Sequence, residues 1–509
     1  MSDSRSRGNS YHAWNRCMSL ARTCSNMRQL KAIHAIFTVH GIHINTYAIS
    51  KLIAFCALAP SGSVSYASLL FHRTPSRNSF IYNTLIRAYS RSTQPHRALV
   101  YFRLMLDEMP ETGVIADQHT FPFVLAACAG IPSASAGEQI HATIFKNGLA
   151  ASDNLVQTAL ARMYVETCLL GSARKLFDEI PERDAVLWNV VMNGYLRSGI
   201  AHETLALFRD MLVSDTEPDG FCIATGLAAC AHSGALQQGI WMHELAKRNG
   251  YMDDIFIGTS LVDMYAKCGC IDKAVAAFED MKERNAFSWA ALISGLAMHG
   301  FAKEAILCLE RMQEEDGLHP DGVVLLGVLT ACSHAGLKEE GYSLLGSMEK
   351  CYGVAPKHEH YSCMVDLLCR AGQLDEALAL VWKMPTKPLA SVWGTLLSGS
   401  RILRCVELAE LAAKELLELE RDGGAQEDDG VYVQLSSVYL CARRQEDARR
   451  VRNMMGSRGI KKTPGCSIIE VDGKVNEFVA GDEAHPLQLQ IHKMLYLLHD
   501  HISFHPRLC

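Results

Sequence analysis

The chain has 509 residues, 49% of them hydrophobic, and a formal net charge of −6. No apolar run is long enough to span a bilayer, so we expect a soluble protein without a membrane segment. The charge is uneven along the chain. Residues 1–106 hold thirteen Lys or Arg and one acidic residue, Asp3, which gives +12 and leaves −18 for the remainder. A globular chain of this length divides into domains, whereas an array of short repeats needs no such division.

The first ten residues, MSDSRSRGNS, are basic, poor in acids and rich in Ser. This composition is typical of an organelle transit segment, with a disordered solvated tail as the plainer alternative. The acid-poor zone continues well beyond a targeting segment, so a basic stripe for nucleic acid is a further candidate.

Helical hairpins are predicted from residue 11 onward. Residues 11–78 form two degenerate copies, and residues 79–389 form a regular array. The clearest copy is Ile255 to Asn285, where an apolar stripe led by Ile257 and Leu261 is broken at Gly269 and resumes at Ala274. Apolar residues at this spacing indicate one face of a helix, and Gly favours the turn that ends it.

Three hairpin types recur in a fixed order. One type carries Trp188-Asn189 and returns at Trp289-Ala290, and another carries an Ala-Cys pair that ends at Cys128, Cys230 and Cys332. The triplet repeats about every 101 residues, and repeats that cannot bury a face alone must stack on their neighbours. We therefore predict an all-α solenoid of helix-turn-helix repeats.

The eighteen cysteines do not indicate a disulfide framework or a metal site. They are scattered without any Cys-x-x-Cys pair, and Cys268 and Cys270 are separated by one residue only. Recurrence at one helical register is typical of small buried side chains, which favours a reducing compartment. We expect no metal and no cofactor.

The C-terminal part departs from the array. Residues 390–465 predict two more helical hairpins, joined by an acidic, Gly-rich linker from Arg421 to Gly430. In residues 466–509, alternating apolar residues flank Asp472-Gly473, a dipeptide that favours a two-residue β-hairpin turn. A last amphipathic helix is expected from Leu487 to His501.

Several segments together carry a family resemblance: WNVVMNGY, GLAACAHSGALQQG, SLVDMYAKCG, VLTACSHAGL and YSCMVDLLCRAGQLDEA. The chain resembles a plant pentatricopeptide repeat protein of the subclass with alternating long and short motifs. Residues 390–465 resemble the E motifs that follow the array in this subclass. Residues 466–509 resemble the further extension, although Ile468 stands where an aromatic residue is usual. The resemblance implies a right-handed superhelix of about eleven motifs with one small β-hairpin.

The resemblance implies binding of single-stranded RNA at about one base per repeat. The base-reading residues are then the fifth and the last residue of each motif. A terminal Asp suits uracil or guanine and a terminal Asn suits adenine or cytosine, while Asn at the fifth position favours pyrimidines and Thr favours purines. The pairs are Ser50 with Asn78, Asn83 with Asp117, Thr158 with Asp184, Asn189 with Asp219, and Thr259 with Asn285.

Two observations weigh against assigning every motif a base. Asn and Asp at hairpin ends are also ordinary helix caps and turn formers. Ala290 breaks the pattern before Asp321, and the Ala-Cys motifs place Pro122, Ala224 and Leu326 at the fifth position, where an apolar group cannot read a base edge.

The family includes members that end in a zinc-dependent cytidine deaminase, which needs His-x-Glu and Pro-Cys-x-x-Cys. Neither occurs here, and His358-Glu359-His360 at a helix start is better explained by capping than by metal binding. We therefore expect no catalytic residues and no enzyme activity of the chain itself.

The resemblance implies a site-recognition factor for cytidine-to-uridine editing of organellar RNA, in the mitochondrion or alternatively the chloroplast. Its expected partners are RNA, a deaminase-bearing pentatricopeptide repeat protein acting in trans and other editing factors. One alternative is an organellar splicing or RNA-stability factor. A second is a protein-binding scaffold of the tetratricopeptide kind, which the acidic net charge favours mildly.

Overall fold

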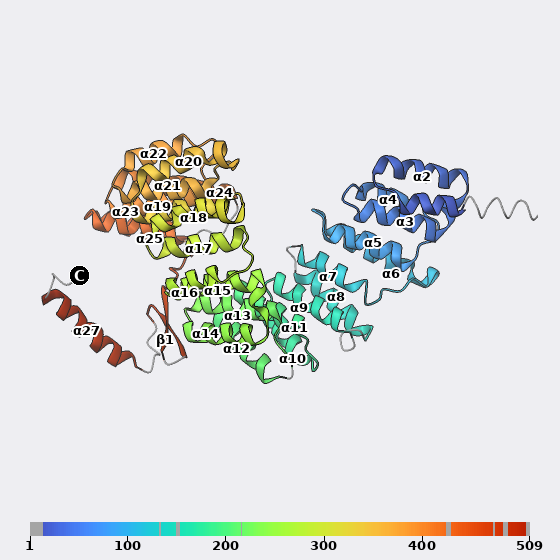
Figure 1. The fold of residues 1–509 in the computed structure, drawn as a ribbon, viewed down its shortest axis with the longest axis horizontal. Coiled ribbons are helices and arrows are strands. Elements are labelled where there is room, and N and C mark those ends of the chain that lie inside the picture. The colour runs from blue at the N-terminus through green and yellow to red at the C-terminus, as the bar shows by residue number, and fades with distance from the viewer. Residues whose placement is uncertain are drawn as a thin grey trace, which may run out of the picture. The chain divides into compact units, whose positions relative to one another are not determined.

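The computed structural model describes residues 14–131, 134–148, 153–214, 216–423, 429–471, 474–481 and 487–504. Coiled ribbons dominate the fold (Figure 1). The chain divides into two compact units, Met1–Thr225 and Gly226–Cys509. Each unit is a stack of helical hairpins, and the second also holds a two-stranded sheet. The predicted all-α solenoid of helix-turn-helix repeats with a small β-hairpin is confirmed.

The first unit begins with helical residues 14–22 and continues as successive hairpins. Its elements are α2 (Met27–Val39), η1 (Ile42–Ile44), α3 (Thr46–Leu58), α4 (Val64–Arg73), α5 (Ser79–Ser90), α6 (His96–Thr112), α7 (Phe121–Ala129), α8 (Ala134–Lys146), α9 (Asn154–Glu166), α10 (Leu170–Glu179), α11 (Ala185–Arg197) and α12 (Ala201–Val213). The boundary between the units falls inside α13 (Gly220–Ser233).

The second unit continues the same alternation of a first and a second helix in each hairpin. Its elements are α14 (Leu236–Arg248), η2 (Tyr251–Asp253), α15 (Ile255–Lys267), α16 (Ile271–Glu279), α17 (Ala286–Met298), α18 (Ala302–Asp316), α19 (Gly322–Ala335), α20 (Lys338–Tyr352), α21 (His358–Arg370), α22 (Leu374–Trp382), α23 (Ala390–Ile402), α24 (Val406–Gly423), α25 (Asp429–Cys441), α26 (Gln445–Ser457), β1 (Cys466–Val471), β2 (Lys474–Val479) and α27 (Gln488–Phe504).

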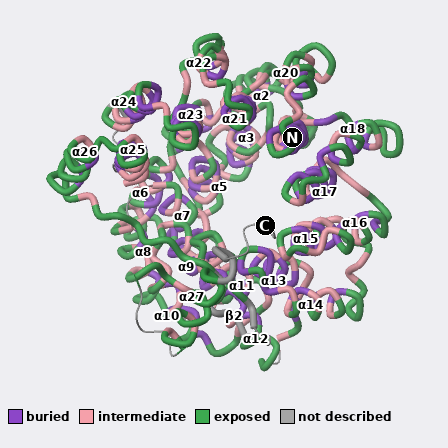
Figure 2. The backbone as a smooth tube through the Cα atoms, turned by 90° about the vertical axis from the view of Figure 1, so that its left-hand side faces the viewer, coloured by how far each residue is buried: buried purple, intermediate pink, exposed green. Residues whose placement is uncertain are grey.

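The hairpin of α15 and α16 shows how the sequence pattern becomes packing. Ile257 and Leu261 on α15 and Ala274 and Phe278 on α16 are all fully buried. Most helices carry buried and exposed residues along their length, as amphipathic helices in a stack must (Figure 2). First helices of successive hairpins contact one another, α15 with α17 and α17 with α19, so the core runs continuously from repeat to repeat.

In the hairpins from α9 to α26, the turn between the two helices depends on one left-handed residue, the fifteenth of the motif. Gly269 has φ +84° and its counterpart Gly372 has φ +76°. Three motifs place a larger residue there: Cys168 (φ 60°), Arg404 (φ 58°) and Arg443 (φ 61°). An L residue in this region costs about 1–2 kcal/mol because its Cβ approaches the following carbonyl. These three turns are therefore strained relative to the glycine turns.

An aromatic pair links three hairpins, α3–α4, α9–α10 and α15–α16, to the hairpin that follows each of them. The fourth residue of the following first helix packs edge-on against a Phe of the preceding second helix, a geometry worth about 0.5–1.5 kcal/mol per pair. An Arg then covers each Phe ring at 4.5–4.6 Å. The ring pairs are Tyr82 with Phe71 (5.1 Å), Trp188 with Phe177 (4.7 Å) and Trp289 with Phe278 (4.6 Å).

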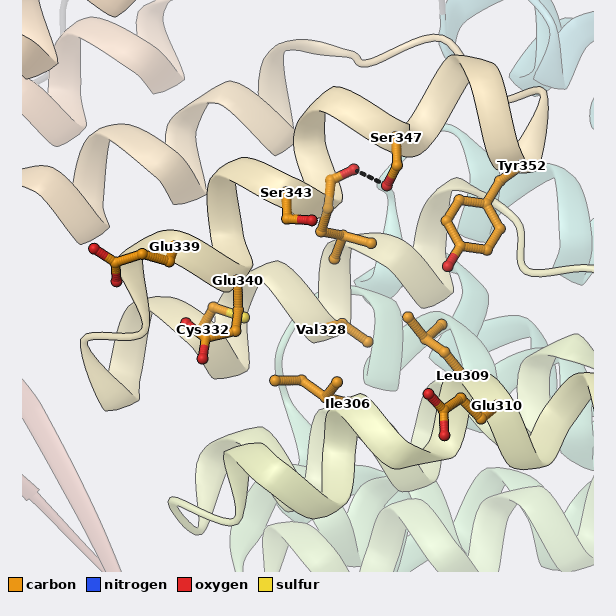
Figure 3. A pocket seen from close by; sticks show the side chains of 11 residues that line it. Ile306, Leu309, Glu310, Val328, Cys332, Glu339, Glu340, Ser343, Ser347 and Tyr352 are labelled. Atoms are coloured by element: carbon orange, nitrogen blue, oxygen red, sulfur yellow. Dashed lines mark hydrogen bonds between the residues drawn. The ribbon is translucent and has the colours of Figure 1, made fainter.

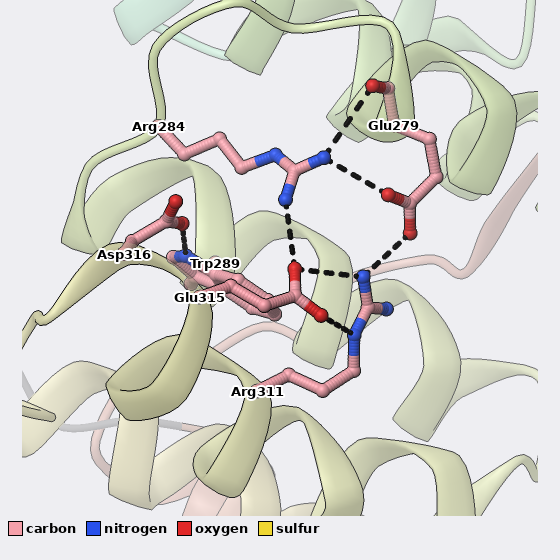
Figure 4. A network of polar contacts seen from close by, with 6 residues as sticks. All are labelled: Glu279, Arg284, Trp289, Arg311, Glu315 and Asp316. Carbon is pink, nitrogen blue, oxygen red and sulfur yellow. Dashed lines mark hydrogen bonds and ion pairs between the residues drawn. The ribbon is translucent and has the colours of Figure 1, made fainter.

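At Trp289 this link is extended by a closed network of ion pairs (Figure 4). Arg284 bonds Glu279 at 2.9 Å and Glu315 at 3.0 Å, while Arg311 bonds the same two carboxylates at 2.8 and 2.7 Å. The indole N–H of Trp289 donates to a carboxylate at the end of α18, that of Asp316, at 2.7 Å. Each charge therefore has two opposite partners, which fixes the junction between α16, α17 and α18.

The hairpins of the Ala-Cys type bury their thiols, as the sequence predicts. Burial raises the pKa of Cys128 and the pKa of Cys332 to about 11. Helix α7 begins only at Phe121, three residues after Gln118, the first residue of its motif, because Asp117 forms a turn with His119 and Thr120. Pro110 lies within the last turn of the long helix α6.

The two C-terminal strands pair antiparallel, with Val471 opposite Lys474 and Cys466 opposite Val479. The predicted turn residues between them, Asp472-Gly473, lie outside the described residues. The last helix, α27, runs from Gln488 to Phe504, close to the expected span.

A histidine-tyrosine bond recurs between hairpins. His34 Nδ1 lies 2.9 Å from Tyr66 Oη, His141 Nδ1 lies 2.7 Å from Tyr164 Oη, and a third bond of 2.8 Å joins His243 to Tyr265. Burial lowers the pKa of each of these imidazoles below its ordinary value of 6.5. The folded protein thus favours the neutral ring at all three contacts.

The turn geometry predicts that Cys168→Gly stabilises the protein, by about 1 kcal/mol, because glycine adopts positive φ without a Cβ clash. Urea unfolding followed by circular dichroism measures the change. Cys168→Ala serves as the control, since it removes the thiol but keeps the Cβ, and it should give no comparable gain. Equal midpoints for the Gly variant and the wild type would show that this turn stores no strain.

The histidine-tyrosine bonds predict a pH dependence. A folded-state pKa below the unfolded value means that the folded chain binds fewer protons, so this stability is complete above about pH 6.5 and falls as the pH drops below that value. Replacing His34, His141 and His243 together by Gln should reduce the loss of melting temperature between pH 7.5 and 5.5. The exposed His202, replaced by Gln, is the control, and an unchanged slope in the triple variant would refute the prediction.

Candidate nucleic-acid interface

The last residue of a motif caps the first helix of the next motif. Asn78 Oδ1 accepts the backbone N–H of Ile81 at 3.0 Å, and Asp184 Oδ1 accepts that of Leu187 at 2.8 Å. Asn285 accepts from the third residue of α17 at 3.0 Å and completes a reciprocal capping box with it. A helix N-terminus exposes N–H groups that have no partner within the helix, and a side-chain oxygen there satisfies one of them.

The cap uses only one of the two polar atoms of each side chain. In the described part of the chain, Oδ2 of Asp184 and Nδ2 of Asn78 and Asn285 have no hydrogen-bond partner. Because the cap requires an acceptor, the amide of each Asn must point its oxygen at the helix and its NH₂ group away. A terminal Asp therefore presents an acceptor and a terminal Asn presents a donor.

Asp219 keeps this arrangement, whereas Asp117 varies it. Asp219 Oδ1 accepts the N–H of Cys222 at 2.8 Å, as the other caps do. Asp117 Oδ1 instead accepts the N–H groups of His119 and Thr120 at 3.0 Å and the Thr120 hydroxyl at 2.9 Å. Both residues nevertheless hold the entry to the next hairpin.

The fifth-position residues lie half-buried on the first helices, with the exception of Ser50, which is buried. Asn83 Oδ1 and Thr259 Oγ1 are covered by neighbouring atoms yet have no hydrogen-bond partner. A covered polar atom without a partner is rare and costs about 1–3 kcal/mol. Rotation of either side chain would bring its polar atom to the surface, where a ligand could satisfy it.

The remaining fifth positions differ in their bonding. Asn189 Oδ1 accepts the hydroxyl of Thr225 on α13 at 2.7 Å, which places Asn189 at the seam between two first helices. Ser50 donates to the Tyr47 carbonyl at 2.7 Å, so its hydroxyl proton is already used. Thr158 is half-buried on α9.

A feature that our sequence analysis did not identify lies beside these residues. The second residue of eight first helices is a large apolar side chain that is 49–69% exposed, and the second and fifth residues of a helix share one face. Exposed apolar groups at a fixed register indicate an interaction surface. They are Tyr47, Phe80, Leu155, Val186 and Phe221 in the first unit, and Phe256, Phe287 and Val323 in the second.

The sequence contained the signal for this feature, because a large apolar residue recurs at the second position of eight motifs. Ser362 was also not identified. It is the fifth residue of the His358 motif, and its hydroxyl is covered without a partner, as in Thr259. The apolar fifth residues Pro122, Ala224 and Leu326 are half-buried at the same register and offer no polar group.

A cavity of about 460 Å³ lies in the second unit, between α18, α19 and α20 (Figure 3). Apolar side chains such as Ile306 and Leu309 line it together with the carboxylates of Glu310 and Glu340. Its one thiol, Cys332, is protonated at neutral pH because burial raises its pKa to about 11. The lining therefore supplies no activated nucleophile.

The described residues contain no group of three His, Cys, Asp or Glu side chains that could hold a metal ion. His360 Nδ1 accepts the Lys357 N–H at 2.9 Å, and its Nε2–H donates to the Gly322 carbonyl at 2.9 Å. This imidazole is thus a capping group. No helix within the described ranges has the length and apolar character needed to cross a membrane.

Comparison with family models gives matches along the chain. A PPR repeat model matches residues 80–108, 186–215, 259–285 and 287–316, and a second PPR repeat model matches 352–385. An E motif model matches residues 404–470. The matched repeats begin within one to four residues of the first residue of α5, α11, α15 and α17.

Similar proteins come from Arabidopsis thaliana. A putative pentatricopeptide repeat-containing protein is 51% identical over 493 residues, covering 96% of this chain and 97% of its own length. A second such protein, described as chloroplastic/mitochondrial, is 39% identical over 96% of this chain and 77% of its own length. A third, described as mitochondrial, is 35% identical over 94% of this chain and 74% of its own length.

Among solved structures, the pentatricopeptide repeat protein PPR10 in complex with an 18-nt psaJ RNA element is similar in fold. The TM-score is 0.63 at 17% sequence identity, over 85% of this chain and 64% of that chain. A crystal structure of PPR10 from maize gives a TM-score of 0.51 at 17% sequence identity, over 88% of this chain and 72% of that chain. At this identity the similarity establishes the solenoid fold.

The cap geometry predicts different effects for two substitutions of Asp184. Asp184→Asn keeps an acceptor for the Leu187 N–H and should leave the stability nearly unchanged. Asp184→Ala removes the acceptor and should cost about 1 kcal/mol. Urea unfolding of both variants measures the difference. If the two variants had equal stability, the side chain of Asp184 would contribute nothing as a cap.

Proposed function

Because this chain belongs to the pentatricopeptide repeat family, we propose that it is a sequence-specific single-stranded RNA-binding factor that marks sites for cytidine-to-uridine editing. The observation that carries the RNA-binding part is the repeated group at the start of the first helices: an exposed apolar second residue, a polar fifth residue and a capping residue with one free polar atom. The names of two relatives as organellar proteins support a mitochondrial location, with the chloroplast as the alternative.

The group can recognise a base in two ways. The exposed apolar side chains offer surfaces on which successive bases stack, an interaction worth about 1–3 kcal/mol per base and available to every base. The free polar atom of the capping residue then distinguishes bases whose ring nitrogen carries a hydrogen from bases whose ring nitrogen presents a lone pair. Uracil and guanine carry an N–H that suits the acceptor of Asp184, whereas adenine and cytosine present a lone pair that suits the donor of Asn285.

The fifth residue distinguishes purines from pyrimidines by the space that it leaves for the base. Thr259 is short and leaves room for a purine, so Thr259 with Asn285 favours adenine. Asn189 with Asp219 favours uracil. The similarity in fold to PPR10, which was solved with RNA, supports the same use of the solenoid here. Motifs with an apolar fifth residue, such as that of Ala224, tolerate several bases.

The editing part of the proposal rests on the C-terminal region. An E motif follows the array, and α27 exposes a large share of its apolar surface: Leu489 is 86% exposed and Tyr496 69%. Apolar surface of this extent on one helix fits a surface that a partner covers. We infer that the partner is a protein that supplies the deaminase, because the chain lacks both zinc-ligand motifs that this chemistry requires. The chain is therefore not itself an enzyme in this proposal.

The base-reading account predicts that Asn285→Asp moves the preference at one RNA position from adenine to guanine. The capping bond is kept, while the free atom changes from a donor to an acceptor. Fluorescence anisotropy against four RNAs that differ only at that position measures the shift. Each mismatch should weaken binding by about 1–3 kcal/mol, the scale found for one misread base pair on DNA.

Asn249→Asp is a matched control, since Asn249 follows a second helix and caps no first helix. It should leave all four affinities unchanged. Should wild-type protein bind all four RNAs equally, Asn285 would be a cap alone and the proposed reading would be wrong.

The C-terminal region predicts a separation of binding from editing. A cut at Ala390 would expose Val365 and Leu368, which pack with Trp393 in one core that continues to α26. Deleting residues 466–509 avoids that damage. This deletion should preserve RNA affinity and abolish editing of the target in organellar RNA. Editing that persists after the deletion would contradict recruitment through this region.

A point variant gives the same test within the full chain. Replacing Leu489, Met494 and Leu498 of α27 by Ser should abolish editing, because it removes exposed apolar groups without touching the array. The matched control replaces the exposed Val213 and Phe145 on second helices, which should leave editing unchanged.

A further inference from the structure

Positive charge is concentrated in helical residues 14–22 and in α2–α6 of the first unit. Residues 14–106 contain eleven Lys or Arg and no Asp or Glu. Among the described residues only one of these cations, Arg77, forms an ion pair, with Glu108 at 2.5 Å. The other ten are Arg16, Arg22, Arg28, Lys31, Lys51, Arg73, Arg87, Arg91, Arg97 and Arg103.

In the second unit, several cations form ion pairs. Around α15–α18 the charged groups neutralise one another: Lys267 pairs with Asp263, and Arg284 and Arg311 share Glu279 and Glu315. Paired charges of this kind do not attract a distant polyanion. The unpaired block in the first unit therefore has a potential that the rest of the array lacks.

Three of the unpaired cations lie on the face that carries the second and fifth positions. On α5 and its C-cap, Asn83, Arg87 and Arg91 follow one another at intervals of four residues, which places them in one row along the helix. The Arg87 guanidinium lies 5.5 Å from the Phe123 ring, and its Nε has no hydrogen-bond partner. On α3, Lys51 Nζ lies 5.1 Å from the ring of Tyr47, which is 50% exposed.

Base reading is weak in this same block. Ser50 is buried and its hydroxyl donates to a backbone carbonyl, so only Asn83 offers an uncommitted fifth position. A surface with many cations and few base readers suits the part of a nucleic acid that is the same at every nucleotide. That part is the sugar-phosphate backbone.

We propose that Lys51, Arg87 and Arg91 form a base-independent anchor for the phosphates of single-stranded RNA, beyond the nucleotides that the later motifs read. This inference rests on the proposed RNA binding and extends the bound RNA to a segment of arbitrary sequence. The anchor holds the RNA by charge, so its contribution falls steeply as salt rises.

The test compares two RNAs bound by the full chain, measured by fluorescence anisotropy between 50 and about 300 mM salt, a range across which phosphate contacts weaken strongly. One RNA carries only the nucleotides read by the motifs from α7 onward. The other adds six abasic ribose-phosphate units at the end that faces α2–α6. The abasic extension should tighten binding by the wild type, because phosphates suffice for the anchor.

The variant K51Q/R87Q/R91Q should lose this gain. Its plot of log affinity against log salt should also be less steep by about 2, because each of the three lost phosphate contacts contributes a slope of about 0.7 on a single strand. Its affinity for the short RNA should equal that of the wild type, which also reports that the array is intact. The matched control R28Q/R73Q/R103Q removes three cations from second helices and should keep the gain. The single variant Arg91→Gln, at an exposed helix end, should lose about one contact.

Three results would overturn the proposal. They are an abasic extension that adds no affinity, a gain that survives in K51Q/R87Q/R91Q, and displacement of the abasic extension by poly-L-glutamate at equal charge, which would assign the block to an acidic polypeptide. A wild type that discriminates bases but ignores the extension refutes the anchor alone. A wild type that binds neither RNA refutes the proposed function as well.

Discussion

Consecutive motifs of this solenoid are joined by a capping hydrogen bond. In it, the side-chain oxygen of the last residue of one motif accepts a backbone N–H at the start of the next first helix. Each helix begins with backbone N–H groups that lack a partner, and a repeat protein meets this requirement at every junction. Asn78, Asp184 and Asn285 each supply one oxygen at 2.8–3.0 Å. The aromatic pairs at the same junctions, such as Trp289 on Phe278, then fix the following helix in place.

This bond also decides what the same residues can offer a ligand. A free Asn side chain both donates and accepts, so it cannot sort bases by their ring nitrogen. Once its oxygen is committed to the helix, only the NH₂ group remains, and an Asp in the same place retains only an acceptor. Capping and base reading are therefore not competing explanations of Asn285. The first orients the atom that the second uses.

The regular part of the fold could be predicted from the sequence because each hairpin repeats a local rule. The buried stripe from Ile257 and the turn at Gly269 follow from apolar spacing and glycine chemistry, and both are observed. The delayed start of α7 could not be predicted, since it depends on which groups Asp117 bonds. The bonding of Thr259 likewise depends on neighbouring helices, which spacing along one helix does not reveal.

The central claim is that a terminal residue caps and reads at once, and a crystal structure of the chain with its preferred RNA tests it most directly. We predict that Asn285 Oδ1 still accepts the Ser288 N–H while Nδ2 donates to the ring nitrogen of a base stacked beside Phe256 or Phe287. A structure in which that base contacts neither Asn285 nor Thr259, or in which binding breaks the capping bond, would contradict the account.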